Sequence, residues 1–487
     1  MLYWDKLLHP KRVREKTTVE KTKNDNRTPF KKDFDTVCNS TILRRLQDKA
    51  QVFPLEQEDY ARTRLTHSIE VMSIAESLGM QAAIIIKQSD KKYFSSDINN
   101  LEPCENIDEI PNILKTVALL HDMGNPPFGH LGEQIIGDWF ANNLGKLATN
   151  SDGRLVFKDG SDAKDTLAYK LKGAYAEDLI HFEGNAQLLR LVSKLNLVVD
   201  ETGMNLTYPV LASFIKYPTS STMIDKENLI NKKMGYFSAE KELFDDIQST
   251  LGLNGIRHPL AYLLEAADDI AYLTADIEDA HHKGLLPMDK IEKYLKEKSN
   301  DEIVKKVLEQ MQEYKNLAKN MNYEDDEGYV IHRARVLIKG LMIDSIYISF
   351  NEHYEEIMNG EFKYELLNCS KAATIAEILR KIERENIYYC HHLIENKTRA
   401  FAVITKLLET YVPATVNWNK NDCGKDTAEN LLYSSLSKNY RYICELANQK
   451  DISDAEKIYN KLLLVTDQIS GMTDTHALTV YKRITAN

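Results

Sequence analysis

The chain has 487 residues, with 73 acidic and 62 basic side chains and a formal net charge of -11. This length can bury a large core, either in two or three folding units or in one helical body. The acidic balance argues against a protein that coats nucleic acid, although it leaves a local basic groove open. Apolar runs fall short of a membrane span and the N-terminus lacks the apolar core of a signal peptide, so we expect a cytoplasmic protein without a membrane segment.

The first part of the chain differs in composition from the rest. Residues 11–32 are rich in Lys, Arg, Thr and Asn and poor in apolar side chains, which predicts an extended basic arm over residues 1–33. From Phe34 onward apolar residues recur at three- and four-residue spacing, as in THSIEVMSIAESLG and AYLLEAADDIAYLTADIEDA. This period predicts a mainly α fold with a helical core over residues 34–349.

Two short segments depart from the helical pattern. Residues 150–160 and 195–208 place turn residues around short β-prone runs, which predicts one or two small hairpins that decorate the helical body. Beyond residue 350 the helical pattern continues without clusters of catalytic side-chain types, so we assign residues 350–487 to a C-terminal helical region.

The stretch ALLHDMGNPPFGHLGE, residues 118–133, concentrates polar chemistry at the end of an apolar run. Pro111 fits the first turn of a helix that carries His121 and Asp122 to its C-terminal end, where Gly124 stops it. These two side chains can reach one cation if the following turn makes them converge. An isolated His-Asp pair is more often a surface or capping pair, so a metal assignment depends on further ligands.

Further candidate ligands occur in two other predicted helices. His67 lies in RTRLTHSIEV, and Asp268 and Asp269 interrupt the apolar face of EAADDIAYLTADIEDA. Carboxylates on such a face are costly to bury unless they are paired or bound to a metal. At about 100° per residue, Asp268, Tyr272 and Asp276 share one helix face, whereas Asp269 is rotated away from it. Imidazoles and carboxylates together suit a catalytic Mn, Fe, Zn, Co or Mg ion rather than a closed thiolate site.

This ordered set of motifs resembles the HD-domain metal-dependent phosphohydrolases, and in particular the long bacterial form of the deoxyguanosine triphosphate triphosphohydrolase (dGTPase) family. The stretches that carry the resemblance are NRTPFKKDFDTVCNSTILRRLQDKAQVFPL, RTRLTHSIEV, HDMGNPPFGHLGE, HFEGNAQLLRL, KYPTSS, KKMGYFSAE and EAADDIAY. They follow one another in the expected order from Asn26 to about Asp344. The resemblance implies an HD-domain helical core.

The resemblance also implies roles for individual residues. Four residues would hold a divalent metal ion: His67, His121, Asp122 and Asp268. His130 would act beside the metal as a catalytic acid or base, Glu133 would orient it from three positions along the same helix, and His181 is a second candidate proton donor. Mn2+ or Mg2+ is the expected ion, with Fe, Co and Zn as alternatives.

The reaction implied is attack of a metal-activated water on the α-phosphorus of a deoxynucleoside triphosphate, with dGTP favoured, which releases deoxynucleoside and inorganic tripolyphosphate. The resemblance assigns further substrate contacts, mainly to the phosphates, to Arg64, Asn185, Lys216, Tyr217, Lys232, Lys233 and Arg333. Sugar discrimination is expected at Gln51, Tyr272 and Asp276. An aromatic ring at the 2′ position excludes ribonucleotides, and polar groups can bind the 3′-hydroxyl.

The expected partners are the dNTP substrate and further copies of the chain, with a hexamer as one assembly. The resemblance also implies regulation by nucleotides or single-stranded DNA, to which the basic arm could contribute through Lys11, Arg12, Arg14 and Lys16. Two rival hypotheses stay open. One is a different HD-type nucleotide phosphohydrolase that releases single phosphates, and the other is a nucleotide- or nucleic-acid-sensing protein whose HD site is only a ligand pocket.

Overall fold

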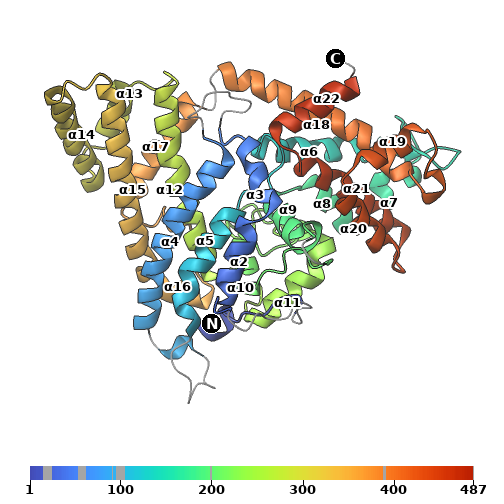
Figure 1. Ribbon diagram of the computed structural model, residues 1–487, viewed down its shortest axis with the longest axis horizontal. Helices are drawn as coiled ribbons and strands as arrows, with labels where there is room; N and C mark the ends of the chain where they lie inside the picture. The colour runs from blue at the N-terminus through green and yellow to red at the C-terminus, as the bar shows by residue number, and fades with distance from the viewer. Residues whose placement is uncertain are drawn as a thin grey trace.

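The structure is a computed structural model that describes residues 1–14, 25–52, 62–89, 91–94, 105–197, 200–387 and 391–485. Over these residues nearly all regular structure is helical, and the strands form one small antiparallel sheet. The molecule is elongated, with a helical centre and a group of helices at each end (Figure 1). The expected mainly α class is confirmed.

Three long helices build the centre of the molecule. They are α4 (Arg64–Gln88), α5 (Ile110–Leu120) and α12 (Pro259–His282), which pack on one another through buried aliphatic side chains. Shorter helices of the central part are α1 (Trp4–Leu7), α2 (Pro29–Cys38), α3 (Thr41–Arg45), α9 (Gly184–Arg190), α10 (Tyr208–Phe214) and α11 (Lys241–Leu251).

Local sequence fixes where each central helix begins. The Thr63 hydroxyl accepts the main-chain N–H of Thr66, and the Thr66 hydroxyl accepts that of Thr63, which forms a capping box at the start of α4. Pro111 and Pro259 occupy the first turns of α5 and α12, where a proline costs no hydrogen bond. Adjacent residues therefore set the positions at which these helices present their His and Asp side chains.

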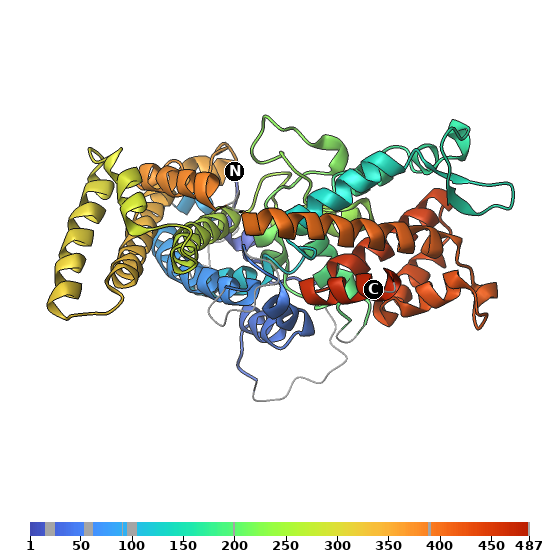
Figure 2. The ribbon, with the colours of Figure 1, turned by 90° about the horizontal axis from the view of Figure 1, so that it is seen from above.

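Each end of the molecule has its own set of helices. One end contains α13 (Met288–Lys296), α14 (Glu302–Asn320), α15 (Asp326–Glu352) and α17 (Ala373–Asn386), at the left of Figure 1. The other contains α6 (His130–Asn143), α18 (His391–Asn417), α19 (Ala428–Ser435), α20 (Lys438–Asn448), α21 (Asp454–Ser470) and α22 (Asp474–Thr485), with α18 alongside α6 (Figure 2). The remaining short helices are α7 (Leu167–Lys170), α8 (Ala174–Ile180) and α16 (Tyr354–Asn359).

One of the two suspected hairpins is present. Strands β1 (Leu147–Thr149) and β2 (Leu155–Phe157) pair antiparallel, with Ala148 opposite Val156. The described residues of the second segment, 195–208, contain no strand and only a single bridge between Thr207 and Arg12. Turn residues around an apolar run therefore produced a hairpin in the first segment and an irregular connection in the second.

Residues 1–14, which the sequence assigned to a basic arm, pack on the helical core. Trp4 is fully buried and donates its indole N–H to the Tyr354 hydroxyl at 2.6 Å. Arg12 forms an ion pair with buried Asp33 at 2.6 Å. These contacts differ from the expected extended arm, because indole burial and ion pairing hold the segment in place. Lys16 lies outside the described residues.

The C-terminal region joins the core without a break at residue 350, because α15 continues to Glu352. Buried Arg190 of α9 pairs with Asp467 of α21 at 2.8 Å and with Glu240 at 3.0 Å. Loss of one partner from such a buried pair costs about 3–5 kcal/mol, because the remaining charge stays buried without compensation. This network ties α21 firmly to the centre of the molecule.

Among the described residues, α4 alone is long and apolar enough to cross a membrane by length and composition. Half of its most apolar window is buried inside the protein, and the helix packs on α5 and α12. Core helices of globular proteins pass the same test. The packing therefore accounts for the apolar character of α4 without a membrane.

His258 at the start of α12 makes the stability of the fold depend on pH. Its Nδ1 accepts the Leu260 main-chain N–H at 3.2 Å, and its Nε2–H donates to the Leu7 carbonyl at 3.3 Å, so the buried ring is neutral. Burial lowers the pKa of His258 from 6.5 to about 4. Between these values the unfolded chain binds a proton that the folded chain excludes, so the free energy of unfolding falls as the pH falls.

We predict that His258→Asn, which keeps a capping acceptor, removes a pH-dependent contribution of about 3 kcal/mol between about pH 7 and about pH 4. Urea denaturation across this pH range measures the difference from the wild type. The exposed His476→Asn variant is the control and should retain the wild-type pH dependence. If the free energy of unfolding varied with pH in the same way for the wild type and His258→Asn, His258 would not be the source of the pH dependence.

Candidate functional site

Four side chains from three helices converge at the centre of the molecule, and we refer to them as the candidate metal site: His67 of α4, His121 and Asp122 at the end of α5, and Asp268 of α12. Ligand atoms of His67, His121 and Asp122 lie within 4.8 Å of one another. The Nε2 atoms of His67 and His121 lie 3.0 Å and 3.5 Å from Asp268 Oδ1. The structure thus brings together the four residues expected to bind a metal.

The surroundings of His121 fit a divalent cation at this site. Its Nδ1–H donates to the Ala118 carbonyl at 2.7 Å, whereas its buried Nε2 has no hydrogen-bond partner. This Nε2 faces carboxylate oxygens of Asp122 and Asp268, each at 3.5 Å. Although burial opposes the charged ring, the two carboxylates raise the pKa of His121 to about 9. A nitrogen that faces two carboxylates needs positive charge between them, which a proton or a metal ion supplies.

Arg64 and Asn125 hold the Asp122 carboxylate in place. The guanidinium donates to Oδ2 at 2.7 Å, and the Asn125 amide donates to Oδ1 at 2.6 Å. Gly129 has a φ of 61°, and a Cβ atom there would lie 2.2 Å from Arg64 Nη2. Glycine therefore allows the chain to pass close to the guanidinium at this position.

His130 and Glu133 form a second polar pair beside the candidate metal site. His130 Nδ1–H donates to Glu133 Oε2 at 2.9 Å, and Glu133 Oε1 accepts the Gly184 main-chain N–H at 3.0 Å. The His130 side chain is 76% exposed, whereas Glu133 is buried. Glu133 raises the pKa of His130, so the imidazole holds a proton more readily than a free histidine. The pair can present that proton to a molecule bound beside it.

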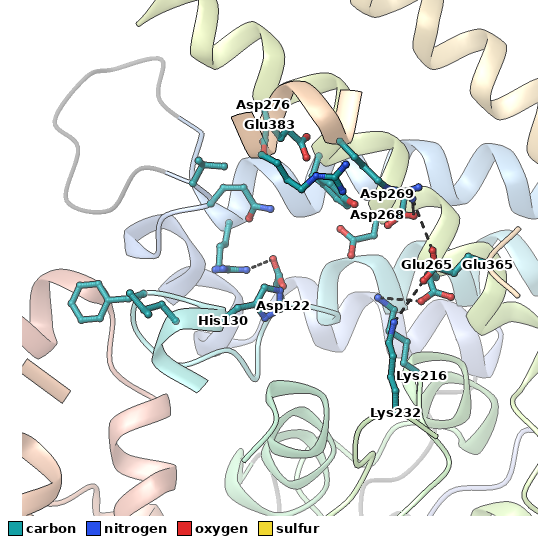
Figure 3. Close-up of a pocket in the computed structure, with 18 of the residues that line it drawn as sticks. Asp122, His130, Lys216, Lys232, Glu265, Asp268, Asp269, Asp276, Glu365 and Glu383 are labelled. Carbon is teal, nitrogen blue, oxygen red and sulfur yellow. Dashed lines mark hydrogen bonds and ion pairs between the residues drawn. The ribbon is translucent and has the colours of Figure 1, made fainter. Parts of the chain in front are cut away.

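A cavity of about 740 Å³ lies against the candidate metal site. Ten residues expected at the site line it: Gln51, Arg64, Asp122, His130, Lys216, Tyr217, Lys232, Asp268, Tyr272 and Asp276. Figure 3 shows Lys216 and Lys232 on the opposite side of the cavity from Asp276, with Asp122 and Asp268 between them. Ligand pockets of roughly 300–1,000 Å³ accept drug-sized molecules, so the cavity has room for a nucleotide.

Two of the three lysines that line the cavity, Lys216 and Lys232, each face a carboxylate. Lys216 Nζ lies 3.6 Å from Glu265, and Lys232 Nζ lies 3.7 Å from Glu365. Although burial opposes its charge, Glu265 raises the pKa of Lys216. These pairs hold the ammonium groups at the cavity wall, where their remaining N–H groups can meet an anionic ligand.

Four residues expected near the substrate do not line this cavity. His181 and Lys233 line a neighbouring hollow of about 520 Å³ that shares His130 and Lys232 with the main cavity. Asn185 donates its side-chain amide to Glu183 at 2.9 Å. Arg333 is exposed on α15, with its guanidinium over a tyrosine ring of α14. Its position gives Arg333 no place in the cavity wall.

Sequence reasoning missed one wall of the cavity. This wall includes Asp269 and, from beyond residue 350, Glu365, Arg380, Glu383, Arg384, Asn396 and Lys397. Arg380 donates to Asp269 Oδ2 at 2.8 Å and so ties α17 to α12. The sequence signal is that Arg380 and Arg384 lie four positions apart on an amphipathic helix, but a solvated helix face gives the same pattern.

The HD domain family model matches residues 64–179, a range that contains His67, His121, Asp122 and His130. Asp268 joins these residues from α12, outside the matched range. The helical core, the convergent His and Asp side chains and the adjoining cavity define an HD-domain protein of the metal-dependent hydrolase class.

Full-length relatives narrow this class further. A protein of Listeria innocua named deoxyguanosinetriphosphate triphosphohydrolase-like protein is 38% identical over 486 residues, which cover 99% of each chain. A protein of Synechocystis with the same name is 31% identical over 99% of this chain and 98% of its own length. The deoxyguanosinetriphosphate triphosphohydrolase of Yersinia enterocolitica is 29% identical over 94% of each chain. The chain belongs to the dGTPase family, as the sequence motifs indicated.

Gly184 provides a test of how tightly the chain packs against the Asn125 and Glu133 side chains, which hold Asp122 and His130. A Cβ atom at Gly184 would lie 2.2 Å from Asn125 Oδ1 and 2.4 Å from Glu133 Oε1. We predict that Gly184→Ala lowers the free energy of unfolding by about 1–3 kcal/mol, because both polar side chains must move. Urea denaturation measures this loss. Gly145→Ala is the matched control, since a Cβ there meets nothing within 4 Å, and equal stabilities of the two variants would rule out the tight packing.

Proposed function

We propose that the protein hydrolyses deoxynucleoside triphosphates, with dGTP favoured, to a deoxynucleoside and inorganic tripolyphosphate through attack of water on the α-phosphorus. The convergence of His67, His121, Asp122 and Asp268 against a cavity of about 740 Å³ carries this proposal. Relatives that bear the dGTPase name support the substrate class. Membership of the family makes the protein a metal-dependent dNTP hydrolase in general terms.

In this proposal four residues hold a divalent ion: His67, His121, Asp122 and Asp268. Imidazole and carboxylate ligands suit Mn2+ or Mg2+ first, with Fe, Co or Zn as alternatives. The ion, when bound, would supply Lewis acidity and lower the pKa of the attacking water. Although burial favours protonation, Arg64 and the neighbouring imidazoles hold the pKa of Asp122 below its usual range, so the carboxylate is ionised for ligation.

The cavity lysines and His130 would act on the triphosphate. Lys216 and Lys232 would bind phosphate oxygens together with Tyr217, because a triphosphate requires cationic and hydrogen-bonding partners. His130 would donate a proton to the leaving 5′-oxygen while Glu133 keeps its ring oriented. His181 stays the second candidate donor, from the adjoining hollow.

Two further candidates for phosphate contacts, Asn185 and Lys233, are both bonded to Glu183. Asn185 would have to exchange its bond to Glu183 for one to the substrate. Lys233 pairs with the same Glu183 at 2.7 Å. Arg333 is left out of the proposal, because it is exposed on α15 away from the cavity lining.

Sugar discrimination would depend on the wall formed by Gln51, Tyr272 and Asp276. Asp276 is only 3% exposed, and its Oδ1 atom has no hydrogen-bond partner, as is also true of Gln51 Oε1. Burial and the nearby Glu383 raise the pKa of Asp276 well above its usual value. Polar groups that lack partners in a cavity can be satisfied by a ligand hydroxyl, and the adjacent Tyr272 ring would exclude a 2′-hydroxyl.

The product of the reaction tests the proposal. We predict that purified protein with Mn2+ or Mg2+ converts dGTP to equal amounts of deoxyguanosine and tripolyphosphate, and that His121→Ala abolishes this turnover because it removes a metal ligand. Ion-exchange chromatography separates the products, and parallel reactions with the other dNTPs and GTP measure base and sugar preference. His282→Ala, an exposed histidine near the end of α12, is the matched control and should remain active.

Two other outcomes would favour the rival functions. Stepwise release of single phosphates would indicate another HD-type phosphohydrolase. Nucleotide binding without turnover under every metal and DNA condition would indicate a sensor.

We also propose a cytoplasmic homo-oligomer, for example a hexamer, with a nucleotide or single-stranded DNA effector. The described part of the basic arm offers limited support for DNA binding, because Lys11, Arg12 and Arg14 already have acidic partners. Lys11 pairs with Asp246 at 2.9 Å and Arg12 with Asp33 at 2.6 Å. An effector would therefore have to displace these carboxylates or bind elsewhere.

A further inference from the structure

Residues 470–475, which comprise the turn between α21 and α22 and the helix ends beside it, pack against two segments that line the cavity. Lys49 is fully buried and donates its ammonium group to the Ser470 carbonyl at 2.9 Å and to the Asn125 carbonyl at 2.5 Å. Arg45 donates to the Gly471 carbonyl at 3.0 Å. Lys49 therefore links the C-terminal turn to the segment that follows Asp122, and Arg45 links the same turn to the end of α3.

Asp474, the first residue of α22, makes the most direct of these contacts. Its side chain is 2% exposed. Oδ1 accepts the Phe128 main-chain N–H at 2.9 Å, and Oδ2 accepts the Ala50 main-chain N–H at 3.0 Å. One carboxylate thus satisfies a buried backbone donor at Phe128 and a partly buried one at Ala50, in separate segments of the chain.

The segment that ends at Phe128 needs such support because of its backbone. Phe128 has a φ of 65° and Gly129 has a φ of 61°, so two successive residues adopt positive φ values. A non-glycine residue in this region costs roughly 1–3 kcal/mol and persists only where its surroundings hold it. His130 comes directly after Gly129 and is the first residue of α6. The hydrogen bond from the Phe128 N–H to Asp474 therefore fixes the position at which α6 begins and presents the His130 side chain.

The other donor, Ala50, leads into a second part of the cavity. Gln51 follows Ala50 and lines the cavity wall. Ala50 also pairs with Thr63, the residue that caps α4, and the Arg64 main-chain N–H donates to the Lys49 carbonyl at 2.8 Å. The bond to Asp474 therefore holds the chain beside the start of the helix that carries His67.

We propose that Asp474 is a positioning residue of the active site, which holds His130 and Gln51 in place through the main-chain N–H groups of Phe128 and Ala50. The inference rests on the proposed hydrolase function. Its consequence is that a residue of the C-terminal helices, which touches no reacting atom, completes the geometry of a site whose metal ligands lie on α4, α5 and α12.

The test is Asp474→Asn, which keeps the shape of the side chain but turns one acceptor oxygen toward a backbone N–H into a donor. We expect kcat for dNTP hydrolysis to fall roughly tenfold to a hundredfold, as misplacement of a catalytic group does. The affinity for Mn2+, measured by calorimetry, should stay within about twofold, because the candidate ligands are held by other bonds. Loss of Mn2+ binding together with kcat would overturn a positioning role, since it would indicate general disruption of the site.

Asp454→Asn is the matched control. Asp454 is the first residue of α21, as Asp474 is of α22, but its side chain is 97% exposed. The same change of charge at a helix start should leave kcat unaltered here.

A double variant tests whether Asp474 acts through His130. If it does, Asp474→Asn should reduce kcat by a smaller factor in a His130→Ala background than in the wild type, because the part of its effect that acts through His130 is already lost. Additive losses, or a kcat within about twofold of the wild type for Asp474→Asn alone, would overturn the proposal.

Hydrogen–deuterium exchange separates this inference from the proposed function. Peptides that contain Ala50 and Phe128 should exchange faster in Asp474→Asn than in wild type or Asp454→Asn, whether or not dNTPs are hydrolysed. If the wild type does not hydrolyse dNTPs, the proposed function is wrong. The exchange data would still show whether Asp474 protects the Ala50 and Phe128 N–H groups. Unchanged exchange would overturn the inference.

Asp474→Ser, which keeps one acceptor in a smaller side chain, replaces the Asn variant if that variant does not fold. The expected results are the same.

Discussion

The placement of the buried Asp122 carboxylate beside the partly buried Asp268 carboxylate is the constraint on which the arrangement of the core depends. Each ionised carboxylate that leaves water without compensation costs several kcal/mol. Arg64 and two imidazoles supply part of the compensation, and a divalent cation would supply the rest. Because these groups come from α4, α5 and α12, the three helices must pack in one register to bring them together. The packing of α4, α5 and α12 therefore also determines the geometry of the site.

Three cationic side chains in the walls of the cavity beside this cluster already face carboxylates. Lys216 faces Glu265, Lys232 faces Glu365, and Arg380 binds Asp269. Such pairs hold long side chains in defined positions before a ligand arrives, which reduces the entropy lost on binding. The site is thus organised for an anionic molecule, and the carboxylates of Glu265, Glu365 and Asp269 hold its cationic side chains in place.

The extent to which the sequence predicts this structure depends on how local each contact is. Capping residues, prolines and the apolar period locate the central helices, and the cost of a buried carboxylate draws attention to Asp268 and Asp269. Residues three apart on a helix predict the pair of His130 and Glu133. The wall from α17 and α18, the packing of Trp4 and the role proposed for Asp474 all depend on contacts between distant parts of the chain. Arg380 looks like any exposed arginine until α17 is placed against α12, and Arg333 looks like a phosphate ligand until α15 is seen to point it outward.

The bonds of Asp474 have a consequence for how the chain folds. They join Asp474 to Ala50 and to Phe128 across 424 and 346 positions of sequence. Bringing such distant segments together costs loop-closure entropy before any contact repays it, and long-range contacts slow folding. The helices of the centre can form from nearer neighbours. Under the role proposed for Asp474, the turn before His130 would reach its final shape only after the C-terminal helices have docked. Helix formation and completion of the site would then be separate events in folding.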